Sequence, residues 1–181
     1  VDDAVTKIGS CNTVVRSEKG WYGTNTDYEG FLRPLRGQGI LRKGIPALVV
    51  GAGGVARTVV YALKKAGLKV TIVNRTDEKA EKLAGELGAR FHPIQNELPT
   101  DYFQVVVQTT SAGMEPNTEV DPLPGYPFSG SEVVYELIYA PEETLFLKRA
   151  AQKGCRTIGG RAMLHEQAVL QFDLFSSVYS P

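Results

Sequence analysis

The chain has 181 residues, of which 43% are hydrophobic and 22% charged, as expected for an ordinary globular domain with one well-buried core. Its 20 basic residues balance 20 acidic ones, so the net charge is zero. This balance argues against a nucleic-acid or anionic-membrane surface, which would need a basic excess, and a bound anion must instead be held by a few well-placed groups.

The cysteines and the chain ends give further expectations. Cys11 and Cys155 lie far apart without a CxxC pair, so two reduced thiols in a cytosolic protein are favoured over a lone disulfide, and no metal site is expected. Neither an apolar run of ~20 residues nor a signal-peptide pattern is present, which favours a cytoplasmic location, or a plastid one for a plant-like parent. Val1 opens a polar segment without an initiator Met, which indicates a piece of a longer polypeptide.

The first forty residues differ in pattern from the rest. Residues 12–15 and 21–24 resemble two short strands around a turn at 18–20. Thr26 and Glu29 then have the spacing of a capping box, which predicts the start of a helix.

Short apolar runs alternate with stretches of helical spacing over the remainder of the chain. The runs predict strands at 47–50, 68–74, 105–108, 133–138 and 157–158. The spaced stretches predict helices at 53–66, 77–87, 142–153 and 161–175. Gly67 and Gly88 stand where C-terminal caps of the first two helices belong, and Pro141 opens the third. The alternation predicts βαβ units, hence an α/β fold of the Rossmann type: a doubly wound parallel sheet with helices on both faces.

A glycine-rich turn joins the first predicted strand to the first predicted helix. It consists of Gly51, Ala52, Gly53, Gly54, Val55 and Ala56. Gly51 permits a tight turn, Gly53 lets a pyrophosphate approach the backbone, and Ala56 lets the helix pack closely on the strand. The free N–H groups at the helix start would face the phosphates. The turn therefore predicts dinucleotide binding, the alternative being a turn selected only for packing.

The end of the second strand indicates which dinucleotide is bound. An NAD site usually places a carboxylate there for the ribose 2′-hydroxyl, but this chain has Asn74, Arg75 and Thr76. A guanidinium can form a forked contact with a 2′-phosphate, Thr76 adds a hydroxyl, and Lys79 follows one turn later. These residues predict NADP as cofactor; the alternative for Arg75 is a solvated arginine at the sheet edge.

Several separate motifs resemble those of the shikimate dehydrogenase family, in the family's order. The resemblance covers nearly the whole chain but only the later two thirds of the family's enzyme. Besides the nucleotide turn and Asn74-Arg75-Thr76, the motifs are Gly9-Ser10-Cys11-Asn12-Thr13, Gly23-Thr24-Asn25-Thr26-Asp27, Thr110-Ser111-Ala112-Gly113-Met114, Tyr139-Ala140-Pro141 with Thr144, and Gly160-Arg161-Ala162-Met163-Leu164-His165-Glu166-Gln167.

This resemblance implies an NADP-dependent oxidoreductase that interconverts 3-dehydroshikimate and shikimate by hydride transfer in aromatic amino acid biosynthesis. It also implies roles for single residues. Asp27 would be catalytic, paired with a lysine that handles the proton at the oxygen. The substrate would contact Asn12, Asp27, Tyr139 and Gln167, while the cofactor would contact Thr109, Ser111, Leu137, Gly160 and Met163 in addition to residues 51–55, 74–76 and Lys79.

The family's lysine lies in an N-terminal substrate domain, within an Asn-Val-Thr-x-Pro-x-Lys motif that does not precede Asp27 here; Lys7 and Lys19 have other surroundings. We therefore interpret residues 1–26 as the edge of a substrate domain, 27–160 as the NADP-binding domain, and 161–181 as a C-terminal helix that packs back toward the substrate domain. The missing domain and shikimate or 3-dehydroshikimate are the expected partners. The chain alone is expected to bind NADP without catalysis.

Alternatives remain open at this point. The chain could be a non-catalytic NADP-binding or regulatory module of the same family, or part of a quinate/shikimate dehydrogenase; a glutamyl-tRNA reductase would not explain Asn25-Thr26-Asp27 together with Gln167. Four residues depart from the family pattern and leave the exact substrate open: Cys11, Tyr28, Gln108 and Glu136.

Overall fold

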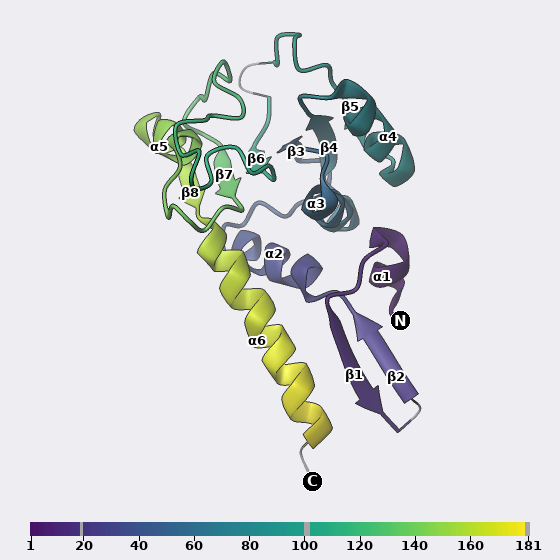
Figure 1. Ribbon diagram of the computed structural model, residues 1–181. Coiled ribbons are helices and arrows are strands. Elements are labelled where there is room, and N and C mark those ends of the chain that lie inside the picture. Colours follow the sequence, from purple (N-terminus) through teal and green to yellow (C-terminus); the bar gives the residue numbers. More distant parts are fainter. Residues whose placement is uncertain (19, 100–101, 180–181) are drawn as a thin grey trace.

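The computed structural model describes residues 1–18, 20–99 and 102–179 (Figure 1). The predicted α/β fold is confirmed. Its centre is a six-stranded sheet with the order β5-β4-β3-β6-β7-β8, and every neighbouring pair is parallel. The strands are β3 (Pro46–Val50), β4 (Lys69–Val73), β5 (Arg90–Phe91), β6 (Val105–Gln108), β7 (Val133–Glu136) and β8 (Arg156–Ile158). The chain reverses its direction of progress across the sheet between β3 and β6, which creates the topological switch point of a Rossmann fold.

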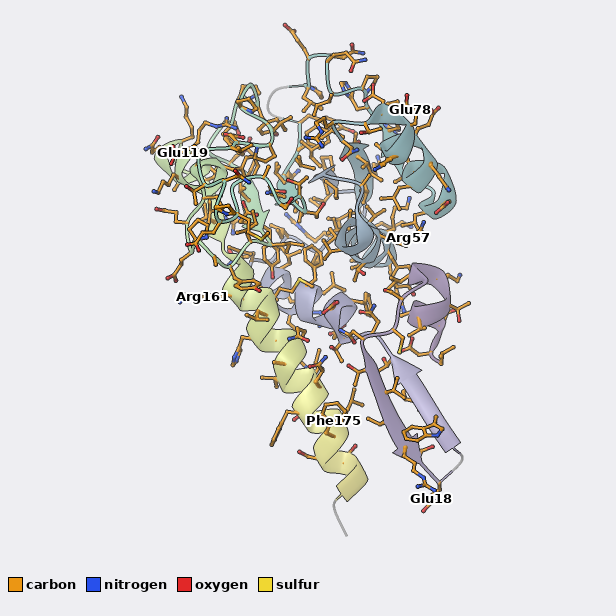
Figure 2. The ribbon with its side chains drawn as sticks, viewed as in Figure 1. Glu18, Arg57, Glu78, Glu119, Arg161 and Phe175 are labelled. Atoms are coloured by element: carbon orange, nitrogen blue, oxygen red, sulfur yellow. The ribbon has the colours of Figure 1, made fainter. Side chains whose placement is uncertain are left out.

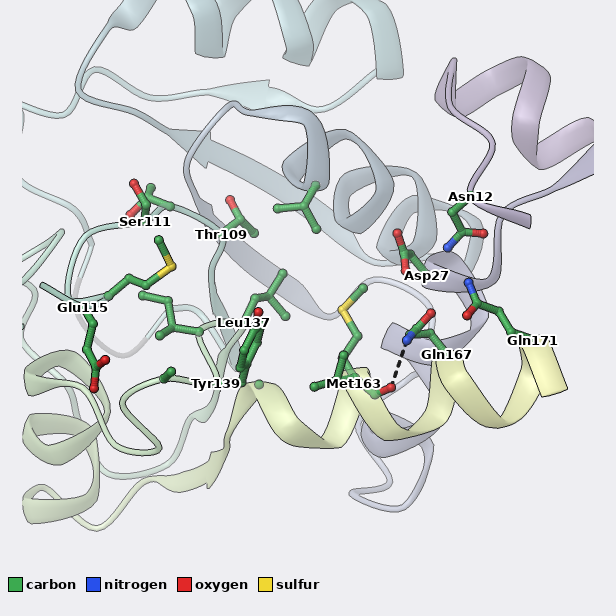
Figure 3. A pocket seen from close by; sticks show the side chains of 17 residues that line it. Asn12, Asp27, Thr109, Ser111, Glu115, Leu137, Tyr139, Met163, Gln167 and Gln171 are labelled. Carbon is green, nitrogen blue, oxygen red and sulfur yellow. Dashed lines mark hydrogen bonds between the residues drawn. The ribbon is translucent and has the colours of Figure 1, made fainter. Parts of the chain in front are cut away.

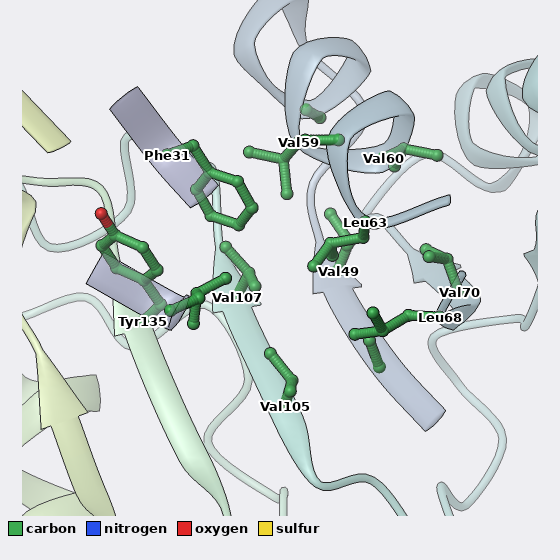
Figure 4. Close-up of a cluster of buried hydrophobic side chains, with 14 of the residues drawn as sticks. Phe31, Val49, Val59, Val60, Leu63, Leu68, Val70, Val105, Val107 and Tyr135 are labelled. Atoms are coloured by element: carbon green, nitrogen blue, oxygen red, sulfur yellow. The ribbon is translucent and has the colours of Figure 1, made fainter. Parts of the chain in front are cut away.

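Helices cover both faces of this sheet. One face carries α2 (Thr26–Arg36), α3 (Gly54–Lys65) and α4 (Asp77–Leu87), while α5 (Leu145–Gln152) lies on the other. The side chains of β3 alternate between the two faces: Ala47 and Val49 pack under α3, whereas Leu48 and Val50 belong to the cluster with α5. Figure 4 shows part of the first cluster, in which α3 packs on the central strands. Burial on both faces explains why the central strands β3, β4, β6 and β7 read as nearly continuous apolar runs.

Two glycine caps predicted from the sequence are confirmed. Gly67 has φ +89°, and the N–H groups of Gly67 and Leu68 donate to the carbonyls of Lys64 and Leu63, the two bonds of a Schellman motif. Gly88 ends α4 with φ +63°. Each cap turns the chain from a helix into the strand or loop that follows.

Two predicted helix starts are wrong. The N-cap of α2 is Asn25, whose side chain accepts from the Asp27 N–H, and Glu29 pairs with Arg36 rather than closing a capping box with Thr26. The helix α5 begins after Thr144, whose hydroxyl accepts from the Leu147 N–H at 3.2 Å, and not at Pro141. In both places a side chain able to cap lies within a few residues of the predicted one.

Elements of the N-terminal region complete the fold. The predicted strands form an antiparallel hairpin of β1 (Thr13–Ser17) and β2 (Gly20–Thr24); the turn expected at 18–20 includes Lys19, which lies outside the described residues. A six-residue helix that the sequence analysis missed, α1 (Asp3–Ile8), precedes the hairpin and buries Ala4 and Ile8 against Tyr61.

The last helix, α6 (Gly160–Tyr179), packs along α2 and against β1. Its C-terminal half and the hairpin project from the same end of the molecule, away from the sheet (Figure 1). Figure 2 shows Phe175 and Glu18 at these projecting ends, and Trp21 and Phe172 are 75% and 70% exposed. Both cysteines are free thiols. Within the described ranges, no helix is long and apolar enough to cross a bilayer, and no cluster of His, Cys, Asp or Glu suited to a metal ion occurs.

The loop at 115–130 lies against the α5 side of the sheet. Its apolar side chains pack in the buried cluster around Phe146; they are Leu123, Tyr126 and Phe128. Arg149 on α5 holds the loop in place by an ion pair with Asp121 at 3.0 Å. The same guanidinium donates to two loop carbonyls, those of Leu123 and Tyr126. Irregular chain and α5 therefore cover this face of the sheet together.

Candidate functional site

Two cavities open at the carboxyl edge of the sheet. One has a volume of about 770 Å³ and the other about 710 Å³, and Thr109, Thr110 and Ser111 line both. These three residues follow β6 directly, so the shared wall stands at the switch point between β3 and β6. Crevices at this position are where open α/β sheets bind ligands. We call the smaller one the nucleotide cavity and the larger one the polyol cavity, after the NADP and the polyol shikimate that the sequence leads us to expect.

The glycine-rich turn forms one wall of the nucleotide cavity. Gly51 has φ +118°, and a Cβ there would overlap the Oγ1 of Thr109, which donates to the Val50 carbonyl at 2.8 Å. Only glycine fits both the backbone angle and this close approach. Gly53 is the N-cap of α3, and a Cβ on it would meet open space. The first N–H groups of a twelve-residue helix are thus accessible from a cavity, the geometry of an anion site.

The opposite rim of the nucleotide cavity is basic. It is lined by Asn74, Arg75, Thr76 and Lys79. The Asn74 side-chain amide donates to the Thr76 carbonyl at 2.8 Å and so shapes the turn after β4. Arg75 and Lys79 are exposed, and neither forms an ion pair within the described part of the chain. Two uncommitted cations therefore face a hollow that a phosphate could occupy.

The polyol cavity has a polar end next to an apolar stretch (Figure 3). The polar end gathers Asn12, Asp27, Gln167 and Gln171, from the hairpin entry, α2 and α6. Leu137 and Met163 lie between this end and Ser111. A flat ring bound here would have polar groups on one side and an apolar wall on the other.

Asp27 stands at the polar end, in the first turn of α2. Its carboxylate is half-buried, and burial raises its pKa above the ordinary value, an effect that a hydrogen bond from Asn12 partly offsets. No ion pair involves Asp27 among the residues described. A cation placed next to such a partly desolvated carboxylate would stabilise its negative charge.

Asn12 is held by its neighbours in a defined orientation. Its Oδ1 accepts from the Thr26 N–H and from the Thr13 hydroxyl, both at 2.9 Å. Its Nδ2 donates to Thr26 Oγ1 at 3.1 Å. These bonds fasten the hairpin entry to the start of α2, which brings Asn12 beside Asp27.

Gln167 is brought to Asp27 by the contact of α6 with α2. Gly30 on α2 allows this contact, because a Cβ there would lie 2.8 Å from both the backbone nitrogen and the Cβ of Gln167. An ion pair of Arg33 with Glu166 at 3.1 Å joins the same two helices. The Gln167 side chain donates to the Leu164 carbonyl at 3.1 Å, as drawn in Figure 3.

Two buried polar side chains support the loops that line both cavities. Gln108 and Glu136 are register partners at the ends of β6 and β7, and both are fully buried. Gln108 donates to the carbonyls of Thr110 and Ala112, while Glu136 accepts from the Ile138 N–H at 3.2 Å. Burial raises the pKa of Glu136 to about 7. Each side chain thus fixes the loop that follows its strand.

The structure brings the predicted site residues together with one exception. The polyol cavity is lined by the predicted residues Asn12, Asp27, Val55, Thr109, Ser111, Leu137, Tyr139, Gly160, Met163 and Gln167. The nucleotide cavity is lined by Gly51, Ala52, Gly53, Asn74, Arg75, Thr76 and Lys79, again with Thr109 and Ser111. Gly54 lines neither and is the first residue of α3. Glu115 and Gln171 also line the polyol cavity, and no sequence motif predicts them; only the spacing of four between Gln167 and Gln171 indicates the latter.

Fold and cavities together define a Rossmann-type domain with a nucleotide cavity and an adjoining polar cavity at the switch point. Comparison with known proteins identifies the family. The sequence model described as shikimate / quinate 5-dehydrogenase matches residues 40–115. The NADP⁺-dependent shikimate dehydrogenases of Moorella thermoacetica and Thermus thermophilus are 38% and 40% identical, over 100% and 95% of this chain and 65% and 64% of their own length. The chain belongs to the shikimate dehydrogenase family and spans just under two thirds of the length of these relatives.

Solved structures agree with this assignment. Shikimate 5-dehydrogenase from Thermus thermophilus, in complex with NADP(H) and shikimate, is 39% identical with a TM-score of 0.86, over 97% of this chain and 66% of that one. The 5-ketofructose reductase of a Gluconobacter strain is 32% identical with a TM-score of 0.84, over 97% and 66% of the two chains. The fold shared with these structures extends over 97% of this chain.

Proposed function

We propose that this chain is the NADP-binding part of a shikimate dehydrogenase, which interconverts 3-dehydroshikimate and shikimate. The observation that carries the proposal is the pair of cavities that share residues 109–111. One has the features of a dinucleotide phosphate site, and the other gathers three carboxamides and a carboxylate that has no ion pair among the described residues, beside a partly apolar wall. The similarity to a structure that contains NADP(H) and shikimate supports the same function.

NADP fits the nucleotide cavity by its charges. The pyrophosphate would lie at Gly53 and the N-terminus of α3, and the 2′-phosphate at Arg75, Thr76 and Lys79. Residues 51–55 and Asn74 would shape the pocket, and Thr109 and Ser111 would lie beneath the cofactor where the cavities meet. When bound, NADPH supplies the hydride. Leu137, Gly160 and Met163 would bound the space next to the substrate and exclude water from it.

The polyol cavity would bind the substrate through Asn12, Asp27, Tyr139 and Gln167. Carboxamides both donate to and accept from hydroxyl groups, so they suit a polyol. Asp27 would hold the ammonium of a lysine supplied by the part of the enzyme that this chain does not span, and so keep a proton at the substrate oxygen. Burial of Asp27 without a cation of its own supports this pairing.

The same reasoning extends to the domain division. We propose that residues 1–26 form the edge of a substrate domain, that 27–160 bind the cofactor, and that 161–181 return to the substrate domain. The hairpin and the C-terminal half of α6 project together and expose Trp21 and Phe172, which supports burial of this end by the remaining third of the enzyme (Figure 1).

Shikimate-dependent reduction of NADP⁺, followed at 340 nm, tests the function. The chain alone is expected to bind NADP⁺ and to form no NADPH. A chimaera that carries the N-terminal third of the Thermus thermophilus enzyme before Val1 is expected to be active, and Asp27→Asn in this chimaera is expected to lower kcat by about 10²-fold or more. Activity of the chain alone would show that the proton is handled by a residue within it. An inactive chimaera that binds NADP⁺ normally would favour a non-catalytic module.

A second substrate is favoured by one observation. A 5-ketofructose reductase shares this fold over almost the whole chain, so reduction of an open-chain or cyclic ketose is compatible with the same cavity. Quinate assayed with NADP⁺ beside shikimate, and 5-ketofructose assayed with NADPH beside 3-dehydroshikimate, in the same chimaera, decide between these substrates by their kcat/KM values.

A further inference from the structure

One wall of the nucleotide cavity has no role in the function proposed above. The phosphates of NADP account for the glycine-rich turn after β3 and for the basic rim after β4. A further wall belongs to the loop between β6 and β7 and contains Asn117, Val120, Asp121 and Pro122. In the sheet, β3 lies between β4 and β6, so this wall and the basic rim lie on opposite sides of the turn. The adenine base is the part of NADP that remains to be placed there.

Apolar side chains make this part of the cavity suitable for a flat ring. Val120 and Pro122 line it from the loop, and Ile94 lines it from the segment that follows β5. Val120 is 46% exposed, although its side chain is apolar. A purine packed on this side chain would remove apolar surface from water, which stabilises the bound state.

Asp121 brings a negative charge to the same wall, and its carboxylate is held in place. The Oδ2 accepts from the Arg149 Nε at 3.0 Å, and the Oδ1 accepts from the Leu123 N–H at 2.8 Å. The Asp121 side chain is only 13% exposed. The Arg149 guanidinium is itself packed 4.7 Å from the centroid of the Phe128 ring. The ion pair offsets a charge that would otherwise repel an anionic cofactor, and the two contacts fix the carboxylate at the cavity wall.

This carboxylate can accept further hydrogen bonds. A carboxylate has about four acceptor positions, and described residues of the chain use two of those on Asp121. An acceptor of this kind selects for a ligand group that donates an N–H or O–H and against one that presents an oxygen. The adenosine half of NADP offers two such donors, the 6-amino group of adenine and the 3′-hydroxyl of the ribose. A 2′-phosphate at Arg75 would keep the ribose on the β4 side, so the 6-amino group is the donor that extends to the loop.

We propose that Asp121 is a base-recognition residue, whose carboxylate accepts a hydrogen bond from the 6-amino group of adenine while Val120 packs against the ring. The inference rests on the proposed function, because it requires NADP in this cavity. The alternative is that Asp121 only ties the loop to α5 through Arg149. In that case its replacement changes stability and leaves the choice of base unchanged.

The experiment compares two dinucleotides that differ at one group of the base. Calorimetry on the whole chain gives the Kd for NADP⁺ and for nicotinamide hypoxanthine dinucleotide phosphate, in which an oxygen replaces the 6-amino group. Asp121→Asn keeps the size of the side chain, and its amide can accept from adenine or donate to hypoxanthine. Asp121→Ser keeps an oxygen able to accept from the Leu123 N–H, so that the loop retains one of its ties. Glu119→Gln is the matched control, at an exposed carboxylate of the same loop outside the cavity lining (Figure 2).

We expect the wild-type chain to bind NADP⁺ about 10-fold or more tightly than the hypoxanthine analogue, as for the loss of one hydrogen bond to a charged group. In both Asp121 variants the ratio of the two Kd values should fall to within about threefold of one. Glu119→Gln should keep the wild-type ratio. Loosening of the loop alone would weaken both dinucleotides together and leave the ratio unchanged, so the ratio separates recognition from a structural role.

Two results would overturn the inference and leave the proposed function standing. One is a wild-type ratio close to one, and the other is a wild-type ratio that persists in both Asp121 variants. A wild-type chain that does not bind NADP⁺ overturns the cofactor part of the proposed function and this inference with it.

Discussion

The carboxylate of Glu136 accepts a hydrogen bond from the Thr144 hydroxyl at 2.9 Å, and both side chains are buried. Because Thr144 is also the N-cap of α5, this contact couples the end of β7 to the start of the next helix. Between them runs the segment that carries Leu137 and Tyr139 into the polyol cavity.

The raised pKa of Glu136 predicts a pH-dependent stability. Burial raises this pKa from 4.5 to about 7, so the folded state holds a proton that the unfolded state releases. The stabilisation is fully present below the unfolded value and is lost as pH rises toward 7. For Glu136→Gln we expect this loss to disappear, a difference of up to about 3 kcal/mol in the free energy of unfolding between roughly pH 4.5 and 7. Urea denaturation of both proteins across this range measures it.

Glu132 provides the matched control, since it is equally buried and shifts in the other direction. Burial raises its pKa, but hydrogen bonds from the Ser129 backbone and hydroxyl and from the Cys155 thiol outweigh this and hold the pKa below its ordinary value. Its contribution is lost as pH falls, so Glu132→Gln should make the stability less sensitive to acid. Parallel pH profiles for wild type and Glu136→Gln would contradict the prediction for Glu136.

Tyr135→Phe is expected to stabilise the protein. The Tyr135 ring stacks on Phe31 with centroids 5.1 Å apart, but its hydroxyl is buried and has no hydrogen-bond partner in the described part of the chain (Figure 4). Phenylalanine keeps the stacking and removes the unsatisfied group, so the free energy of unfolding should rise by about 1 kcal/mol. In Tyr61→Phe, the control, the hydroxyl accepts from Lys65, and no gain is expected. A loss in Tyr135→Phe larger than in Tyr61→Phe would reveal a partner for the Tyr135 hydroxyl.

Arg75→Ala is expected to separate the two dinucleotides. If the guanidinium holds the 2′-phosphate, its loss removes a charged hydrogen bond of about 1.5–3 kcal/mol, which weakens NADP⁺ about 10- to 150-fold. NAD⁺ lacks that phosphate, so its Kd should change by less than about threefold. Arg16→Ala, on the exposed hairpin, changes the net charge equally and should affect neither. Calorimetric titrations of the wild type and of both variants with NADP⁺ and with NAD⁺ measure these Kd values. Equal losses of affinity for both cofactors in Arg75→Ala would refute NADP selection by Arg75.

Gly51→Ala and Gly85→Ala should have opposite effects. At Gly51 the backbone has φ +118° and a Cβ would overlap Thr109, so alanine should lower the melting temperature and weaken NADP⁺ binding. Gly85 lies inside α4 with open space around its missing Cβ, so alanine should raise the free energy of unfolding by about 0.5–1 kcal/mol. Thermal denaturation tests both. A Gly51→Ala protein with wild-type stability and affinity would mean that the turn is not constrained as described.

The sheet was predictable because its determinants are local. The strands β3, β4, β6 and β7 are largely apolar runs that end at or just before a glycine or polar residue, whereas the two-residue β5 (Arg90–Phe91) has no such pattern and is not predicted from the sequence. The glycines at 67 and 88 end α3 and α4 through their own backbone conformation. The nucleotide cavity was predictable for the same reason, because its glycine-rich turn and its basic rim are each formed by a short continuous segment of the sequence.

Helix starts were less predictable because long-range contacts choose among adjacent caps. The N-cap of α2 could be any of Asn25, Thr26 and Asp27 by residue type. A distant residue, Asn12, accepts a hydrogen bond from the Thr26 N–H and so favours Asn25 as the N-cap. Gln171 is the extreme case, since its partner Thr13 is 158 residues away in the sequence. Residues whose role depends on such a distant partner give no local signal.

The close approach of Gly30 to Gln167 has a mechanical consequence. Two helices in backbone contact, further joined by the ion pair of Arg33 with Glu166, are expected to move as one rigid body. Asp27 on α2 and Gln167 on α6 should therefore keep their spacing whenever the position of either helix shifts.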